Sequence, residues 1–194
     1  MLKPQDVVLL LKFLSNPDHL KWTQAKMAMH LCMSSSEINA GIKRLIKAGL
    51  LQLSHIPLKG VSTLLNERIE SKQNMERVYQ PIIDACEEFL ISSVKYHFPV
   101  KLGEFTAGIA TSYASSILSS HIMIGNDPIP VWPYAEGRKR GQSLEPLYPS
   151  VPKSVSLFPD PKFYDLLCLM DVLRQGRVRE RILAIKMLKE RINP

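Results

Sequence analysis

The stretch Thr23–Leu51, TQAKMAMHLCMSSSEINAGIKRLIKAGLL, decides the fold of the first third of this 194-residue chain. Its apolar residues recur at helical spacing in two short runs, which a tight turn at Cys32 separates. Ser34 lies three residues before Glu37, and this spacing is typical of a capping box that opens a helix. The stretch therefore predicts two short helices joined by a tight turn, over about 23–31 and 35–48.

The second predicted helix has one apolar and one polar face. Its inward positions are Ile38, Ile42, Leu45 and Ile46. Its outer face has small polar residues first and basic residues later, a pattern that lets a helix enter the major groove of DNA. Asn39 can make a two-pronged contact to adenine. We expect DNA phosphates to be contacted by Thr23, Lys26, Ser34, Arg44, Lys47 and Lys59.

The same stretch resembles the winged helix-turn-helix of bacterial transcriptional regulators of the broad MarR-like kind. The resemblance rests on Ala28 in the first helix, Ser34 opening the second, Ile38 four residues on, and the ending Ala48–Leu51. It covers about residues 1–65, and it departs from the pattern at Cys32, where glycine is usual and a side chain strains the turn. The resemblance implies that the groove is read by Ser35, Ser36, Asn39, Ala40 and Lys43.

A winged domain also needs a hairpin after the second helix. We expect its strands at Gln52–Ile56 and Val61–Leu64, with Lys59 at the tip reaching a phosphate or the minor groove. Pro57 interrupts the pattern and weakens it.

The remainder of the chain predicts a mainly α fold in which a C-terminal helical domain follows the winged domain. Further helices are expected over about 4–14, 80–96, 113–122, 160–175 and 178–192. Eight of the 14 prolines lie between Asn126 and Pro161, which favours an extended segment wrapped on the helices. The expected divisions are 1–65 for DNA binding, 66–125 for connection and dimerisation, 126–160 for the proline-rich segment, and 161–194 for a helical hairpin.

Charge is concentrated at the two ends of the chain, whose formal charge is +7. Residues 1–65 hold eight basic and three acidic groups, and Arg174–Arg191 holds seven basic and two acidic groups. A basic balance favours a polyanionic partner. The basic final helix is either a second DNA contact or a solvated face, and the latter is favoured.

Other functional classes have weak support in the sequence. The three cysteines are scattered, which fits a reducing cytosol, and no apolar run approaches the length of a membrane span. The histidines and cysteines show no metal-ligand spacing. The motif SxxK occurs at Ser92–Lys95 and Ser150–Lys153. A motif this short arises often by chance, and no nucleophile–base pattern supports it in this sequence. We expect a cytoplasmic protein with no membrane contact, no cofactor, no metal and no enzymatic activity.

The sequence therefore predicts a sequence-specific regulator that binds double-stranded DNA as a homodimer, through the helix beginning near Gln80 and the last two helices. By loose analogy with regulators that accompany toxin–antitoxin or phage-defence operons, it would be an autoregulator. The first alternative is a protein-interaction module, such as an antitoxin or defence-complex subunit, without specific DNA binding. The second is an enzyme, either a nuclease or a Ser-Lys hydrolase. The sequence does not identify a protein partner or a small-molecule effector.

Overall fold

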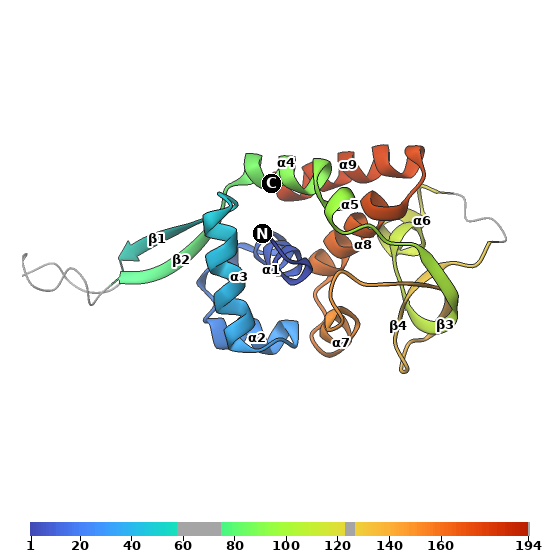
Figure 1. Ribbon diagram of the computed structural model, residues 1–194, viewed down its shortest axis with the longest axis horizontal. Coiled ribbons are helices and arrows are strands. Elements are labelled where there is room, and N and C mark those ends of the chain that lie inside the picture. Colours follow the sequence, from blue (N-terminus) through green and yellow to red (C-terminus); the bar gives the residue numbers. More distant parts are fainter. Residues whose placement is uncertain (58–74, 123–126, 194) are drawn as a thin grey trace, which may run out of the picture.

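Helices predominate in the structure, a computed structural model that describes residues 1–57, 75–122 and 127–193 (Figure 1). The strands form two small sheets, one in each part of the chain. The mainly helical character predicted from the sequence is thus confirmed in outline, although the C-terminal part mixes helices with strands. Within the described ranges, no helix has the length and apolar character needed to cross a membrane.

The N-terminal part is a group of helices followed by an antiparallel hairpin. Its elements are α1 (Pro4–Ser15), η1 (Pro17–Lys21), α2 (Gln24–Leu31), α3 (Ser35–Lys47), β1 (Leu51–Pro57) and β2 (Met75–Pro81). The two strands pair over their full lengths, with Leu51 opposite Pro81 and Pro57 opposite Met75. In Figure 1 the hairpin projects away from the helices on the outer side of α3.

The local signals around the tight turn act as the sequence predicts. The Thr23 hydroxyl accepts a hydrogen bond from the Lys26 amide (3.2 Å), and the Ser34 hydroxyl accepts one from the Glu37 amide (3.2 Å). The Glu37 carboxylate accepts in return from the Ser34 amide (2.8 Å), which completes the capping box. Cys32 is left-handed, with φ of 51°, and a side chain there costs about 1 kcal/mol that glycine would avoid.

The hairpin is longer than predicted. Its first strand is confirmed and includes Pro57, which pairs with Met75 at the last described position of the ladder. The partner of this strand is β2, not the predicted Val61–Leu64, which lies outside the described residues together with Lys59. The boundary expected at residue 65 therefore falls between the two strands.

The single helix predicted over Gln80–Tyr96 begins three residues late and is interrupted at Ser93, although its predicted end at Tyr96 lies within helix. Gln80 pairs with Gln52 in the hairpin, and the Ile82 amide donates to the Leu50 carbonyl (3.0 Å), so strand pairing overrides local helical propensity. The helical part is α4 (Ile83–Ser92) followed by the short α5 (Val94–His97).

Strands that the sequence does not predict appear in the C-terminal part. Its remaining elements are β3 (Leu102–Ala110), η2 (Ser112–Ala114), α6 (Ser116–Ser119), β4 (Pro130–Pro133), β5 (Lys139–Leu144), α7 (Val151–Leu157), α8 (Pro161–Gln175) and α9 (Val178–Ile192). β3 pairs antiparallel with β4 and β5, and β4 pairs parallel with β5, so the three strands close a small barrel. The segment predicted as extended over 126–160 is extended at β4 and β5, whose pairing the sequence did not predict, and the prediction is wrong at the helix α7. The helix predicted at 113–122 is reduced to η2 and α6.

Glycine makes this barrel possible despite its prolines. A Cβ on Gly108 would lie 2.0 Å from the Trp132 carbonyl oxygen, and one on Gly141 would lie 1.9 Å from the Ile129 carbonyl oxygen. Only glycine allows such close backbone approach. Pro130 begins β4, where the missing amide is tolerated.

The core is built around α1 and α8, which touch each other. Val7–Leu11 of α1 and Leu166–Leu173 of α8 are buried without interruption. Such burial on all sides places both helices inside the molecule, as Figure 1 shows for α1 between α3 and α8. The prediction that α8 supplies a dimer surface is therefore wrong, because the monomer already covers it.

A buried ion pair joins α1 to α3. The Asp6 carboxylate is fully buried and accepts from Arg44 at Nε (2.7 Å) and Nη2 (2.6 Å), and from the Lys3 amide (2.8 Å). Gly41 allows the close approach, because a Cβ there would lie 3.0 Å from Leu9 and 3.1 Å from the Asp6 carboxylate. The guanidinium of Arg44 thus holds two helices together, and we assign it this structural role in place of a phosphate contact.

We expect Arg44→Ala to lower the free energy of unfolding by about 3–5 kcal/mol, because it leaves the Asp6 carboxylate buried without its partner. Arg44→Lys recovers only part of this loss, since an ammonium cannot supply the two-pronged contact. Urea denaturation measures both. The exposed neighbour Lys43 is the control, and Lys43→Ala should stay within about 0.5 kcal/mol of wild type. Equal losses at the two positions would contradict the structural role of Arg44.

Candidate nucleic-acid interface

The outer face of α3 is open to solvent. Exposed side chains on it are Ser35, Ser36, Asn39, Lys43 and Lys47, and Ala40 is half-buried at its edge. Within the part of the chain that the structure describes, these polar side chains make no hydrogen bond or ion pair with another side chain. The five residues expected to read bases therefore lie together on one helix face, with their donors and acceptors available to a ligand.

The residues expected to contact phosphates divide into three groups. Lys47 is exposed, and Lys26 is exposed with its ammonium 4.3 Å from the centre of the Trp22 ring. Thr23 and Ser34 cap α2 and α3, and the Ser34 hydroxyl already donates to Glu37 (2.7 Å). Arg44 is bound to Asp6, and Lys59 lies outside the described residues.

The C-terminal part reaches the start of α3, a contact that sequence reasoning missed. The Tyr148 hydroxyl donates to Glu37 in the capping box. The hydroxyls of Ser150 and Ser154 donate to the carbonyls of Leu31 (2.7 Å) and His30 (2.6 Å), at the end of α2. These three bonds join partners more than a hundred residues apart. The only sequence signal was the apolar content of the proline-rich segment, which indicates packing without naming the surface.

Hydrogen bonds set the ionisation of Glu37. Donation by Tyr148, and then by the amide and hydroxyl of Ser34, lowers the pKa of the Glu37 carboxyl. The same bond raises the pKa of the Tyr148 phenol, because its proton is held by the carboxylate. Glu37 is therefore an anion near neutral pH and places a negative charge at the positive N-terminal end of α3.

A buried polar cluster joins the end of α1 and η1 to Asp160, the residue that caps the start of α8. The Lys12 ammonium pairs with Asp160 (2.7 Å), and the Ser15 hydroxyl lies 3.2 Å from Nδ1 of His19. These residue types resemble a hydrolytic triad, but Nδ1 of His19 also lies 2.7 Å from the Lys12 carbonyl oxygen and donates its proton there. That nitrogen is consequently not a base for Ser15, and burial lowers the pKa of His19. The cluster is best explained as structural.

The described ranges contain no cluster of metal ligands, and two of the three thiols are unreactive. No group of three or more His, Cys, Asp or Glu side chains there could hold a metal ion. Cys86 and Cys168 are buried, and burial raises the pKa of both thiols to about 12. A thiol with such a pKa is a poor nucleophile. In the second SxxK motif the Ser150 hydroxyl is already bonded to a backbone carbonyl.

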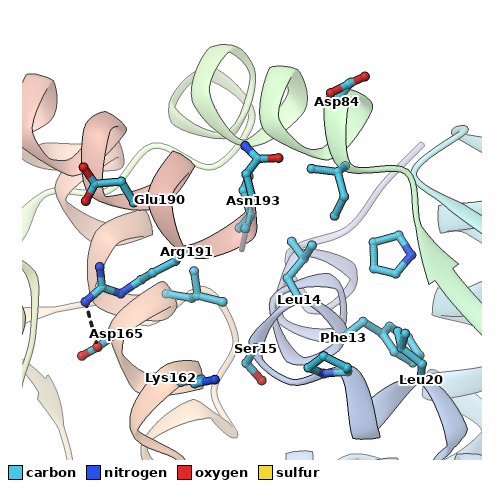
Figure 2. A pocket seen from close by; sticks show the side chains of 15 residues that line it. Phe13, Leu14, Ser15, Leu20, Asp84, Lys162, Asp165, Glu190, Arg191 and Asn193 are labelled. Atoms are coloured by element: carbon cyan, nitrogen blue, oxygen red, sulfur yellow. Dashed lines mark hydrogen bonds and ion pairs between the residues drawn. The ribbon is translucent and has the colours of Figure 1, made fainter.

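A cleft of about 810 Å³ lies between the end of α1, the start of α4, and α8 and α9 (Figure 2). Leu14 and Phe13 contribute apolar surface, and Arg191 contacts Asp165 across 3.3 Å at its edge. Burial raises the pKa of Asp165, opposed by this arginine. An apolar lining with a few charged groups is typical of a small-molecule site. Because its charges have both signs, the cleft does not select a ligand class.

Comparison with family models, with curated proteins and with solved structures finds no match for this chain.

We expect Tyr148→Phe to lower the free energy of unfolding by about 1 kcal/mol at neutral pH, because one hydrogen bond to a carboxylate is lost. The lowered pKa of Glu37 means that this contribution is present above pH 4.5, its ordinary value, and fades as acid protonates the carboxyl. Denaturation at pH 7 and pH 3 tests the sign.

Tyr134 provides the matched control for this experiment. Its hydroxyl donates to the exposed Glu136 at 3.3 Å, so Tyr134→Phe should change stability by less than about 0.5 kcal/mol at either pH. A Tyr148→Phe loss that persists undiminished at pH 3 would show that Glu37 ionisation is not involved.

Proposed function

We propose that this chain binds double-stranded DNA sequence-specifically as a transcriptional regulator, with residues 1–81 forming a winged helix-turn-helix. In this proposal α3 is the recognition helix, α2 supports it, and the β1–β2 hairpin is the wing. The observation that carries the proposal is the outer face of α3, where small side chains surround the exposed amide of Asn39. Small neighbours allow a helix backbone to approach base edges closely.

Residues in the first turns of α3 contact the bases in this proposal. The Asn39 amide offers one donor and one acceptor, which match the edge of adenine in the major groove. Ser35 and Ser36 precede it by about one turn and can contact bases or phosphates. Ala40 presents a methyl group suited to the methyl of thymine.

In this proposal the exposed lysines around this face contact the DNA phosphates. Lys43 and Lys47 are one helical turn apart on α3, and Lys26 lies on α2, restrained against the Trp22 ring. Cations at these positions would neutralise the backbone on both sides of the groove. Arg44 is left out of this group, since its charge is already matched by Asp6.

A homodimer is part of the same proposal. Val178 and Ile182, one turn apart on α9, are 62% and 64% exposed. Large apolar side chains in such a pair favour association across a two-fold axis. Two recognition helices would then meet half-sites about 34–36 Å apart on one face of the duplex. A genomic target would place the protein in the cytoplasm.

We expect Asn39→Ala to weaken binding to the selected site by roughly 1–3 kcal/mol while leaving random duplex almost unaffected. The site is first obtained by selecting bound DNA from a random pool, and fluorescence anisotropy then measures both duplexes. Unchanged affinity for both would remove the base-reading role of Asn39.

Lys43→Ala and Lys47→Ala should instead weaken binding to all sequences and reduce the salt slope by about 1 each. Lys162 is an exposed lysine on α8 that lines the cleft described above. Lys162→Ala is therefore the charge-matched control and should leave the salt slope unchanged. Negligible affinity of the wild type for every duplex at about 50 mM salt would instead favour the protein-interaction module.

Sedimentation tests the dimer. We expect a dimer at micromolar concentration and a monomer for the double variant Val178→Asp, Ile182→Asp, because two buried charges oppose association. Leu157→Asp, at an equally exposed apolar residue on α7, is the control and should remain dimeric. A monomeric wild type, with or without DNA, would contradict the proposal.

A further inference from the structure

Three consecutive cations lie at the start of β5, where Arg138 precedes the strand and Lys139 and Arg140 are its first residues. Arg138, Lys139 and Arg140 are all exposed, and no ion pair involves them within the described ranges. The acidic side chain nearest in sequence is Glu136, whose carboxylate accepts from the Tyr134 hydroxyl (3.3 Å). This part of the surface therefore carries concentrated positive charge, although the middle of the sequence shows no basic excess as a whole.

Backbone packing holds the three cations in place. Gly137 lies against Gly108 of β3, where an added Cβ would be 2.3 Å from the backbone. Lys139 and Arg140 then pair with Gly108 and Ala107 in the β3–β5 ladder. Because the backbone is ordered by the barrel, a ligand gains these charges without first ordering a loop.

An exposed aromatic ring adjoins the cations. Phe105 on β3 is 57% exposed, and the Arg140 guanidinium lies 5.7 Å from the centre of its ring. Phe105 and Ala107 are two residues apart on one strand, and Arg140 pairs with Ala107, so the ring and the guanidinium share a face of the barrel. The cation–π contact restrains the Arg140 guanidinium at the surface, where its charge remains available.

We propose that this basic strip, Arg138–Arg140 with Phe105, is a second DNA contact that binds phosphates of duplex flanking the segment read by α3. The inference rests on the proposed function and deepens it. Charge complementarity selects the occupant: uncompensated cations on an ordered backbone match phosphates, with Arg140 on the Phe105 face of β5 and Lys139 on the other face. In Figure 1 the connection between β4 and β5 extends toward the same edge of the view as α2 and the start of α3.

The test uses a short duplex that covers only the selected site and a long duplex that adds flanks on both sides. We expect the wild type to bind the long duplex more tightly. The strip variant Arg138→Ala, Lys139→Ala, Arg140→Ala should bind the short duplex like wild type and the long one about tenfold more weakly at physiological salt. Its salt slope on the long duplex should fall by about 2 to 3.

A matched variant removes the same charge elsewhere. Arg179→Ala, Arg181→Ala, Lys186→Ala neutralises three cations on α9 that make no ion pair in the described ranges, and it should retain the preference for the long duplex. Thermal melting confirms that both triple variants fold, which is expected because all six side chains lie outside the core.

The outcomes separate this inference from the proposed function. A strip variant that keeps the full long-duplex preference overturns the second contact, and so does an equal loss in the α9 variant, which would show an effect of net charge alone. Either result leaves the role of α3 intact if Lys43→Ala still weakens both duplexes. A wild type that binds neither duplex overturns the proposed function together with the inference.

Discussion

The pairing of Asp6 with Arg44 is the constraint on which the arrangement of the N-terminal helices depends. A carboxylate with no exposed surface is tolerated only when its charge and its lone pairs are matched, and Arg44 and the Lys3 amide do both. The pair fixes α3 against α1 at a separation that Gly41 permits. Because the Arg44 side chain points inward, it orients the opposite face of α3, including Asn39 and Lys43, toward solvent.

The same helix α1 ties the N-terminal part to the rest of the chain. Its apolar run Val7–Leu11 is buried on every side, which requires α8 as well as α3. The bonds from Tyr148, Ser150 and Ser154 to α3 and α2 add a second connection. The N-terminal helices are thus not an independent module on a tether, and any signal that shifts α7 or α8 acts directly on the elements that position α3.

Features that depend on neighbouring residues could be predicted from the sequence, and those that depend on distant partners could not. The capping box at Ser34 and the left-handed Cys32 involve residues within a few positions of one another, and the bounds of α2, α3, α8 and α9 follow. The return strand of the hairpin needed the pairing of β1 with β2 across residues 58–74, an interval too long for a local pattern to specify, and Gly60 favoured a nearer return. The barrel was missed because its strands depend on contacts such as Gly141 against Ile129, which no local pattern encodes.

At the candidate site, the availability of each charge likewise depends on distant partners that the sequence does not reveal. Sequence position alone makes Lys43, Arg44 and Lys47 equivalent cations, yet the structure neutralises the arginine internally and leaves both lysines exposed. On the basic last helix, Lys189 is bound to Glu87 and Arg191 to Asp165, whereas Arg179, Arg181 and Lys186 make no ion pair in the described ranges. A polyanion can gain only from cations without internal partners. The formal charge of +7 therefore does not locate a site for a polyanion, because ion pairs reduce the charge available on α9 but not that of Arg138–Arg140 in the described ranges.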